Sequence, residues 1–283
     1  MVVGLTTSCV ASDAITRARS GWSDAAAPAV AVAVIGDFGT GGAGERAIAG
    51  EVRAWTAAVD ADALVTTGDN VYPAGHPRQF EAAWTIPYGW VAEQDMPVIA
   101  SLGNHDVKSA VGRHVMQLFD MPERRYLTSA GPVNFIVLDS NREWFDSQRR
   151  WLIRKLRAPD RGWRIAVFHH PPFSCAKHGN TRRVVESWVP LFERYGVDLV
   201  LNGHEHAYQR FARRGVSYIV TGGAGARLYE IEGCAPDTPR LRASDDDSHH
   251  FVTIEGDDER LVVTAIAADG SVLDSFELAA GGG

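Results

Sequence analysis

Two histidines stand two residues apart in the run Gly203-His204-Glu205-His206. They follow the apolar stretch 197–202, which we expect to be a β-strand. In extended chain, side chains at positions i and i+2 point to the same side, so His204 and His206 can face one centre while Glu205 faces away. Imidazole is the commonest side-chain metal ligand. Taken alone, this pair fits a metal site and two ordinary loop histidines equally well.

Four other predicted strands end in side chains of the same kind. These strands cover residues 30–35, 63–67, 96–101 and 163–168. In sequence order the five strand ends offer Asp37; Asp69 with Tyr72; Asn104 with His105; His169; and His204 with His206. Ligands in α/β folds bind outside the carboxyl ends of strands, so we expect these groups to meet at one edge. Such oxygen and imidazole donors fit a site for two metal ions about 3.5–4 Å apart.

Each of these residues also has an ordinary structural interpretation. Aspartate and asparagine after glycine are good turn formers. His105 can cap a helix, and Tyr72 can belong to the core. Of the neighbours His169 and His170, an extended chain can aim only one at a given centre. The metal-site hypothesis therefore depends on all five strand ends occurring together.

Two competing patterns are weaker. Gly39-x-Gly41-x-x-Gly44 lies between a predicted strand and a predicted helix, as a dinucleotide-binding fingerprint does, and the next strand ends near Asp69. A lone fingerprint is a weak signal, and no later feature supports a cofactor domain. The run 245–250 is rich in aspartate and histidine but follows no strand end. We expect a solvated loop there.

The composition is that of ordinary globular protein and limits the partners. The chain has 283 residues, of which 45% are hydrophobic and 22% charged, with a net charge of -7. No cluster of Lys and Arg offers a broad phosphate-binding face, so nucleic acid is not an expected partner. The basic residues of the predicted helix 148–156 are expected to form a solvated face. No apolar run reaches the length of a membrane span.

The pattern predicts one α/β domain over residues 30–278, with tails at 1–29 and 279–283. A helix carrying Ile48, Val52 and Trp55 should follow the first strand, and irregular structure should end near Arg125. A further strand is expected over 133–139. Short strands at 208–211, 216–221, 250–255, 261–267 and 271–278 indicate an antiparallel meander. We expect a disordered tail from Met1 to about Pro28. Thr7-Ser8-Cys9 resembles a lipoprotein cleavage site without its upstream part, so the alternative is a remnant of an export signal.

These motifs resemble those of the metallophosphoesterases, and more narrowly those of the purple (tartrate-resistant) acid phosphatases. The five are Gly36-Asp37-Phe38-Gly39, Gly68-Asp69-Asn70-Val71-Tyr72, Gly103-Asn104-His105-Asp106, His169-His170-Pro171 and Gly203-His204-Glu205-His206. Most metallophosphoesterases have Asp-x-His in the first motif. Here that third position is Gly39, and Tyr72 takes its place, as in purple phosphatases. The resemblance implies a four-layer α/β fold, with a central β-sandwich of mixed sheets flanked by helices.

The resemblance also implies a role for each motif residue. The first metal ion would be held by Asp37, Asp69, Tyr72 and His206, and the second by Asp69, Asn104, His169 and His204, with Asp69 bridging. His105 and His178 match histidines that contact substrate and can protonate the leaving group. Asp106 would orient His105 through a hydrogen bond, and Tyr208 would lie just outside the metal ligands.

The implied reaction is hydrolysis of a small phosphomonoester by a metal-bound hydroxide. Two aspartates and one tyrosinate carry about -3, so ferric iron with divalent iron, zinc or manganese would leave about +2 for a phosphate dianion. Two alternatives stay open. One is a phosphodiesterase on the same metal site, with pocket walls at 72–87, 142–145 and 227–237. The other is a non-catalytic phosphate- or metal-binding relative, against which the complete ligand set argues.

Two cysteines bear on the cellular compartment. Cys175 lies between His169 and His178, and Cys234 follows the loop that begins at Gly222, so both should be near the pocket mouth. We expect a disulfide between them, with two free thiols as the alternative. Their spacing matches no zinc motif. A disulfide favours an exported protein, whether extracellular, periplasmic or in the cell envelope, over a cytoplasmic one. The sequence does not indicate the oligomeric state.

Overall fold

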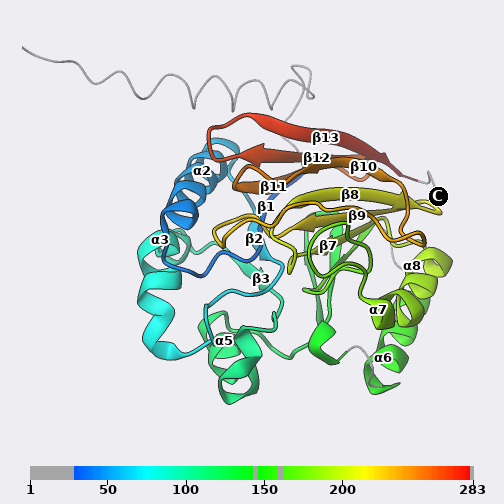
Figure 1. Cartoon of the computed structure of the whole chain (residues 1–283), viewed down its shortest axis with the longest axis horizontal. Coiled ribbons are helices and arrows are strands. Elements are labelled where there is room, and N and C mark those ends of the chain that lie inside the picture. Colours follow the sequence, from blue (N-terminus) through cyan, green and yellow to red (C-terminus); the bar gives the residue numbers. More distant parts are fainter. Residues whose placement is uncertain (1–28, 143–145, 159–161, 281–283) are drawn as a thin grey trace, which may run out of the picture.

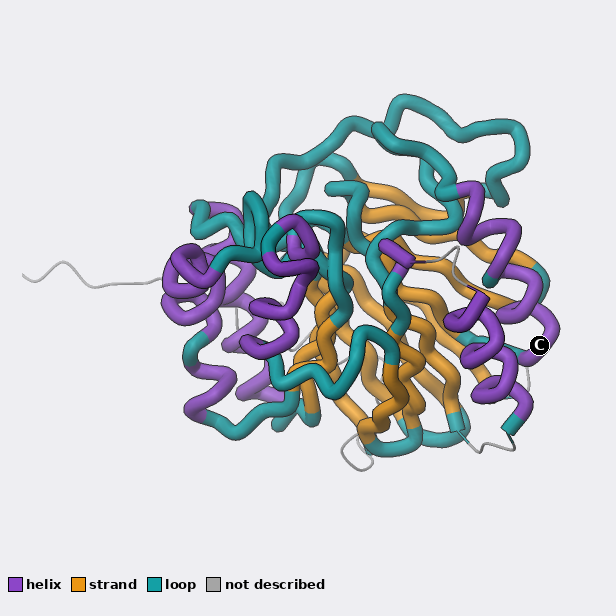
Figure 2. The backbone as a smooth tube through the Cα atoms, turned by 90° about the horizontal axis from the view of Figure 1, so that it is seen from below, coloured by secondary structure: helices purple, strands orange, loops and turns teal. Residues whose placement is uncertain are grey.

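The structure, a computed structural model, describes residues 29–142, 146–158 and 162–280. Two β-sheets pack face to face, and helices cover the outer face of each (Figures 1 and 2). This is the predicted sandwich of mixed sheets with flanking helices. The expected N-terminal tail lies outside the described residues except for its last position, and most of the expected C-terminal tail does too.

The first sheet has the strand order β13-β12-β11-β1-β2-β3. Its parallel part consists of β1 (Val30–Ile35), β2 (Ala63–Thr66) and β3 (Val98–Ala100). Beside β1, the antiparallel strands β11 (His250–Gly256), β12 (Arg260–Ala267) and β13 (Val272–Ala279) form the meander expected from the turn pattern.

The second sheet has the strand order β10-β8-β9-β7-β6-β5-β4. Its parallel strands are β5 (Val133–Val137), β6 (Trp163–Val167), β7 (Leu199–Asn202) and β9 (Val216–Thr221). The antiparallel strands are β4 (Tyr126–Ala130), β8 (Tyr208–Arg213) and β10 (Leu241–Asp245).

Strand β1 is a continuous apolar run because both of its faces are buried. All six of its residues are buried. Alternate side chains point to opposite faces, so Val32 packs with Ile165 and Leu201 of the other sheet, while Ala33 and Ile35 belong to the core beneath the helices. Each fully buried aliphatic side chain stabilises the fold by about 1.5–3 kcal/mol. The two cores fix β1 and β2 in the middle of the molecule, with their carboxyl ends side by side.

The helices complete these cores. In α2 (Ala43–Val59) the predicted residues Ile48, Val52 and Trp55 are buried, and the helix ends where Asp60 turns left-handed with φ 56°. Over the second sheet lie α6 (Asp146–Arg157), α7 (Arg182–Ser187) and α8 (Val189–Tyr195) (Figure 1). Shorter helices are α3 (Ile86–Tyr88), α4 (Trp90–Glu93) and α5 (Arg113–Leu118), with a π-helical turn at Glu81–Thr85 and 3-10 turns at Pro77–Gln79, Asp106–Lys108, Ala110–Gly112 and Ser140–Arg142.

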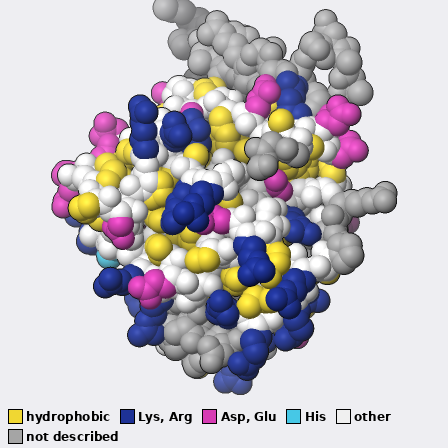
Figure 3. Space-filling model, turned by 90° about the vertical axis from the view of Figure 1, so that its right-hand side faces the viewer, with side chains coloured by type: hydrophobic (Ala, Val, Ile, Leu, Met, Phe, Trp, Pro, Cys, Tyr) yellow, Lys and Arg dark blue, Asp and Glu magenta, His cyan; other side chains and the backbone are white. Residues whose placement is uncertain are grey.

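The basic side of the molecule lies over α6. Arg149, Arg150, Arg154, Lys155 and Arg157 are all exposed, and Lys and Arg side chains gather in the lower half of the face seen in Figure 3. This is the solvated helix face that the alternation of apolar and basic residues predicts. Within the described part of the chain, no helix combines the length and apolarity needed to span a bilayer.

Two strands were missed, and one loop is shorter than expected. Strands β4 and β10 were not predicted, because they are half-exposed edge strands whose polar residues weaken the hydrophobic signal. The run 245–250 forms the expected loop only over residues 246–249. Asp245 is the last residue of β10, and His250, with 0% exposure, is the first residue of β11.

Candidate metal centre

Three polar side chains from distant parts of the sequence meet beyond the ends of β1, β2 and β7. The Tyr72 hydroxyl lies 3.2 Å from Oδ1 of Asp37 and 3.2 Å from Nε2 of His206. That Nε2 is in turn 3.4 Å from Asp37 Oδ1. Three electronegative atoms so close together can share one cation, and the donor set of carboxylate, phenol and imidazole suits a hard metal ion.

A second group of donors lies beside the first. Oδ1 of Asn104 is 3.0 Å from Nε2 of His169 and 3.0 Å from Nδ1 of His204. Nε2 of His169 is also 3.5 Å from Oδ2 of Asp69. Carboxylate, amide and imidazole donors again converge on one point, as an ion-binding site requires.

Asp69 connects the two groups. The ligand atoms of Asp37, Asp69 and His169 all lie within 4.8 Å of one another. Asp69 also lies close enough to Tyr72 to act on the pKa of its phenol. On the other side, Oδ2 of Asp37 accepts a hydrogen bond of 2.8 Å from the backbone N–H of His204. The structure thus brings together all seven residues that the motifs singled out as ligands.

The backbone is strained where it presents these ligands. Asp37, Asp69 and His204 have φ values of 55°, 52° and 70°, in the left-handed region that side-chain-bearing residues rarely adopt. Each costs of order 1–3 kcal/mol and persists only where the surrounding fold enforces it. Two glycines make room for the arrangement. A Cβ on Gly103 would lie 2.1 Å from Oδ1 of Asp69, and one on Gly203 would lie 2.3 Å from Oδ2 of Asp37.

Backbone carbonyls orient two of the imidazoles. Nδ1 of His169 lies 3.0 Å from the carbonyl oxygen of Thr67, and Nδ1 of His206 lies 2.7 Å from that of Arg227. A carbonyl only accepts, so each Nδ1 carries the proton and each Nε2 is left free to bind a metal. Tyr229 then stacks on the His206 ring at 4.0 Å between centroids. No local sequence pattern marks Tyr229, so it was predicted only as part of the pocket wall 227–237.

The electrostatics of the centre are those of a cation site. Burial opposes the charged form of Asp69, but the adjacent His169 outweighs this and holds the Asp69 pKa below its usual range. Burial and the neighbouring Asp37 and Asp69 raise the pKa of the Tyr72 phenol. Burial and the nearby His169 lower the pKa of His204, which favours the neutral imidazole that a metal needs.

Comparison with known proteins decides the family. Residues 30–208 match the family model of the calcineurin-like phosphoesterases, a span that contains every motif described above. The chain belongs to this family.

Within the family, its curated relatives include purple acid phosphatases. The chain is 27% identical over 233 residues to purple acid phosphatase 7 of Arabidopsis thaliana, covering 69% of this chain and 70% of that one. It is 25% identical over 297 residues to tartrate-resistant acid phosphatase type 5 of Homo sapiens, covering 89% and 91%.

Solved structures show the same fold. The purple acid phosphatase PPD1 of yellow lupin superposes with a TM-score of 0.77 at 21% identity, over 88% of this chain and 53% of that one. GAP50, described as the anchor in the inner membrane complex of Plasmodium, superposes with a TM-score of 0.76 at 16% identity, over 88% of both chains.

His105 lies beside the first group of donors. Its ring packs on that of Tyr72 at 4.5 Å, and its backbone N–H donates to Asp69 Oδ1 at 2.7 Å. Its Nδ1 is 2.8 Å from the carbonyl oxygen of Pro73, and the Lys108 ammonium lies 3.0 Å from its Nδ1 and 3.2 Å from its Nε2.

The Asp106 carboxylate does not accept the expected hydrogen bond from His105. The Asp106 carboxylate is fully buried and accepts from the backbone N–H groups of Asn70, Val71 and Gly103 and from the Asn70 side chain. Asp106 therefore holds the second and third motifs together. Burial, with the nearby Asp69, raises its pKa to about 7.

On the opposite side, His178 lies over the second group. Its ring is 4.5 Å from that of His204, and its side chain is 41% exposed. The expectation that Glu205 faces away from this site was wrong. Oε1 of Glu205 accepts from the backbone N–H of His178 at 2.8 Å and lies 3.2 Å from its Nδ1.

Two further expectations need correction. Both His169 and His170 approach the centre, at 5.1 and 4.5 Å from the His204 ring, because β6 ends at Val167 and the chain there is no longer extended. Tyr208 does not lie beside the ligands. It opens β8, whose inner face turns it into the core between the sheets, and its hydroxyl donates to Asp274 Oδ2 at 2.8 Å.

A disulfide joins Cys175 and Cys234, with a Cα–Cα distance of 4.2 Å. It fastens the segment that carries His178 to the loop that carries Tyr229, and Ala176 pairs with Ile231 in an isolated bridge beside it. These segments border a pocket of about 490 Å³ that reaches His206 and is lined by Lys177, Arg227, Tyr229, Leu228, Glu230 and Glu232. The pocket therefore reaches the candidate metal centre at His206.

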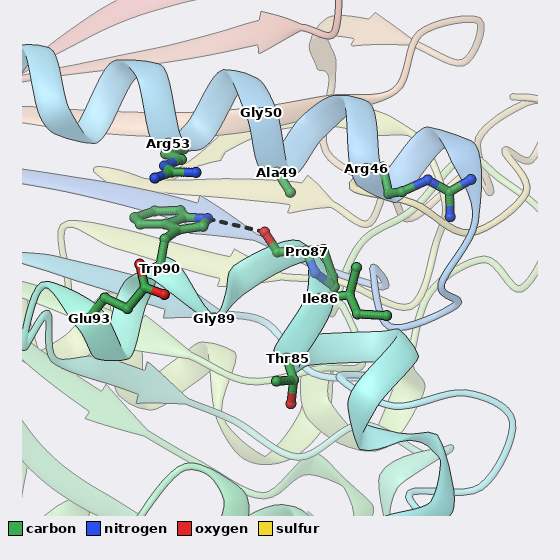
Figure 4. Close-up of a pocket in the computed structure, with 10 residues that line it drawn as sticks. All are labelled: Arg46, Ala49, Gly50, Arg53, Thr85, Ile86, Pro87, Gly89, Trp90 and Glu93. Atoms are coloured by element: carbon green, nitrogen blue, oxygen red, sulfur yellow. Dashed lines mark hydrogen bonds between the residues drawn. The ribbon is translucent and has the colours of Figure 1, made fainter.

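Another pocket, of about 370 Å³, contains none of the proposed ligands (Figure 4). It lies between α2 and the segment 85–93, with Arg46 and Arg53 on one wall. On the other wall the Trp90 indole N–H donates to the carbonyl oxygen of Pro87 at 3.1 Å. No motif residue reaches it, so it adds nothing to the metal centre.

Proposed function

We propose that this protein is a phosphomonoesterase of the purple acid phosphatase type, acting on small phosphate esters at a dinuclear metal centre. The observation that carries the proposal is the position of Asp69 between two adjacent groups of donors, because its carboxylate lies within 4.8 Å of ligand atoms of Asp37 in one group and of His169 in the other. A carboxylate between two ions is the arrangement that a two-metal phosphatase requires.

In this proposal Asp37, Asp69, Tyr72 and His206 hold one ion, and Asp69, Asn104, His169 and His204 hold the other. Bound ions of this kind supply hydroxide near neutral pH and stabilise charge on a phosphoryl group. Thr67 and Arg227 keep two imidazoles in the required tautomer through their carbonyl oxygens. His105 and His178 flank the centre, where they can contact the phosphate and the leaving group.

Tyr72 supports the assignment of ferric iron to the first ion. A phenolate is a harder and more negative donor than the imidazole that most relatives place there, so it favours a trivalent ion. Ferric iron with a divalent iron, zinc or manganese ion is the combination we propose.

Two other functions compete with this one. A phosphodiesterase would use the same donors and differ only in the pocket walls, of which the pocket beside Tyr229 is one. A non-catalytic role is suggested by the likeness to GAP50, whose description is that of an anchor. The complete set of donors and the two flanking histidines favour catalysis.

We also propose that the protein is exported from the cytoplasm. The disulfide between Cys175 and Cys234 supports this, because such bonds persist in oxidising compartments. Cell fractionation with antibody detection tests it, and recovery of the protein in reduced form from the cytosol alone would refute it.

The activity is tested with two substrates that share a leaving group, 4-nitrophenyl phosphate and bis(4-nitrophenyl) phosphate. The metal-loaded protein should hydrolyse the monoester faster, and removal of metal by a chelator should abolish turnover until metal is restored. A faster diester reaction would identify the phosphodiesterase instead. No turnover of either substrate with both metals bound would identify the non-catalytic relative.

A further inference from the structure

His170 lies at the candidate metal centre but has no place among the proposed ligands. Its ring centroid is 4.9 Å from that of His169 and 4.5 Å from that of His204. One ligand nitrogen of each of these three histidines lies within 4.8 Å of the other two. The proposed ligands His169 and His204 therefore have a third imidazole beside them.

The separation of these nitrogens suits one shared ion. Zinc binds imidazole nitrogen at about 2.0–2.1 Å, so two nitrogens on the same ion are at most about 4.2 Å apart. Nitrogens that lie within 4.8 Å of one another need to close by no more than about 0.6 Å to share that ion. The χ2 angle of histidine has a broad range, so a ring rotation of this size costs little.

Ser140 holds one side of the His170 ring and leaves the other open. The Ser140 hydroxyl accepts from the backbone N–H of His170 at 2.9 Å and lies 2.7 Å from Nδ1 of the ring. Ser140 itself is only 1% exposed, so this contact is fixed by the surrounding core. Within the described part of the chain, Nε2 of His170 makes no hydrogen bond. It is therefore the ring nitrogen available to an ion.

The turn that holds His170 also holds the third motif. This 3-10 turn covers Ser140–Arg142, and the side-chain amide of Asn141 donates to the carbonyl oxygen of Gly103 at 3.3 Å. Gly103 directly precedes the proposed ligand Asn104. One turn thus fixes the place of His170 relative to Asn104, as a shared metal site requires.

We propose that His170 is a further ligand of the second ion, through Nε2, and that this third imidazole favours zinc over manganese there. The inference rests on the proposed dinuclear centre. Without His170, that ion would have two oxygen donors, from Asp69 and Asn104, and two imidazoles, from His169 and His204. Imidazole suits zinc, whereas carboxylate and carbonyl oxygens suit manganese. A third imidazole therefore shifts the preference of the site towards zinc.

The direct test counts the imidazoles bound to zinc. In protein loaded with iron at the first position and zinc at the second, X-ray absorption at the zinc edge reports on the second ion alone. We expect three imidazoles per zinc ion in the wild type and two in His170→Phe, which keeps an aromatic ring but has no donor atom. Two imidazoles per zinc ion in the wild type would overturn the proposal, and this measurement needs no variant.

Metal affinity gives a second measure. In competition with a chelating dye, His170→Phe should bind zinc about 100-fold more weakly than the wild type and manganese less than about tenfold more weakly, because loss of a residue just outside the ligands alone costs about 10–100-fold. Ser140→Ala, which removes the hydroxyl beside the ring, should weaken zinc binding by about tenfold. Unchanged zinc binding in His170→Phe, or equal losses for the two metals, would overturn the proposal.

His114→Phe is the matched control. His114 also contacts a serine hydroxyl, with its Nδ1 3.3 Å from Oγ of Ser109, but it belongs to none of the donor groups that the described residues form. This variant should bind zinc and manganese as the wild type does.

Turnover separates this inference from the proposed function. A wild type with three imidazoles on zinc that hydrolyses neither a monoester nor a diester, with both metals bound, would refute the phosphatase function and leave His170 established as a ligand. An active phosphatase with two imidazoles per zinc ion would overturn the role of His170 and leave the proposed function standing.

Discussion

The Tyr72 hydroxyl lies 3.2 Å from Nε2 of His206, although the two residues are 134 positions apart in the sequence. The fold achieves this by placing the carboxyl ends of β2 and β7, in different sheets, at one edge of the sandwich. In the proposed centre, the Tyr72 phenol takes the place of an imidazole ligand. We expect this exchange to decide the identity of the first metal ion.

Tyr72→Phe should therefore change the colour of the protein. Phenolate bound to ferric iron transfers charge to the metal in visible light, so aerobically purified wild type should show a broad visible band. The variant should lose the band while elemental analysis still finds iron. A colourless, iron-free wild type with full activity would contradict the assignment and indicate two divalent ions such as zinc or manganese.

His105→Ala should affect substrates with good and poor leaving groups equally. His105 packs on Tyr72, and the Lys108 ammonium lies 3.0 and 3.2 Å from its two ring nitrogens, so we expect its loss to remove a contact to the phosphate rather than a proton donor. We expect kcat/KM to fall by about tenfold or more for an alkyl and a 4-nitrophenyl ester alike. A loss confined to the alkyl ester would show that His105 donates the proton to the leaving group.

The disulfide should contribute substantially to stability. It joins residues separated by 59 positions, for which loop-closure entropy corresponds to about 4 kcal/mol, and measured effects are typically 2–4 kcal/mol. The double variant Cys175→Ser with Cys234→Ser should lose roughly that amount in denaturant unfolding. Cys9, the remaining cysteine, is present in both proteins, so any effect of reductant on its thiol is the same in both. Equal unfolding midpoints with and without reductant would show that the bond contributes little.

Glu45 should make stability fall as the pH rises. Burial raises its pKa from 4.5 to about 8, against hydrogen bonds from Gly41 and Thr40 that act the other way. The folded state thus binds this proton more tightly than the unfolded state, so its contribution is full below about pH 4.5 and is lost as the pH rises through about 8.

Glu45→Gln removes this titration. The unfolding free energy of the variant minus that of the wild type should increase by about 2–4 kcal/mol from pH 5 to pH 9. Denaturant unfolding at both pH values, with metal content held constant, measures the difference. Parallel pH profiles for the two proteins would contradict it.

Much of this centre was predictable, because strand ends are readable from the sequence. A buried strand such as β1 leaves a continuous apolar run, and the residue after it must lie at the sheet edge where ligands bind. Tyr229 and the contact of Glu205 with His178 were not predictable in the same way. Both depend on left-handed turns and loop packing between segments far apart in sequence, which residue periodicity does not encode.

Two residues whose expected positions were wrong show the same limit of prediction from sequence. Tyr208 and Asp106 belong to motifs, so sequence position placed them at the centre. Their side chains instead fill a core between sheets and a network of backbone donors. Half-exposed strands such as β4 were missed because their polar residues hide the period of two.

The most direct test of the account is elemental analysis of purified wild type alongside Asp69→Asn. Asp69 is the residue shared by the two groups of donors, so we expect two metal ions per wild-type chain, one of them iron. We expect the variant to lose both ions, together with turnover of phosphate monoesters. A wild type that hydrolyses monoesters at full rate with one ion or none, or an Asp69→Asn variant that keeps both ions and full activity, would contradict the account.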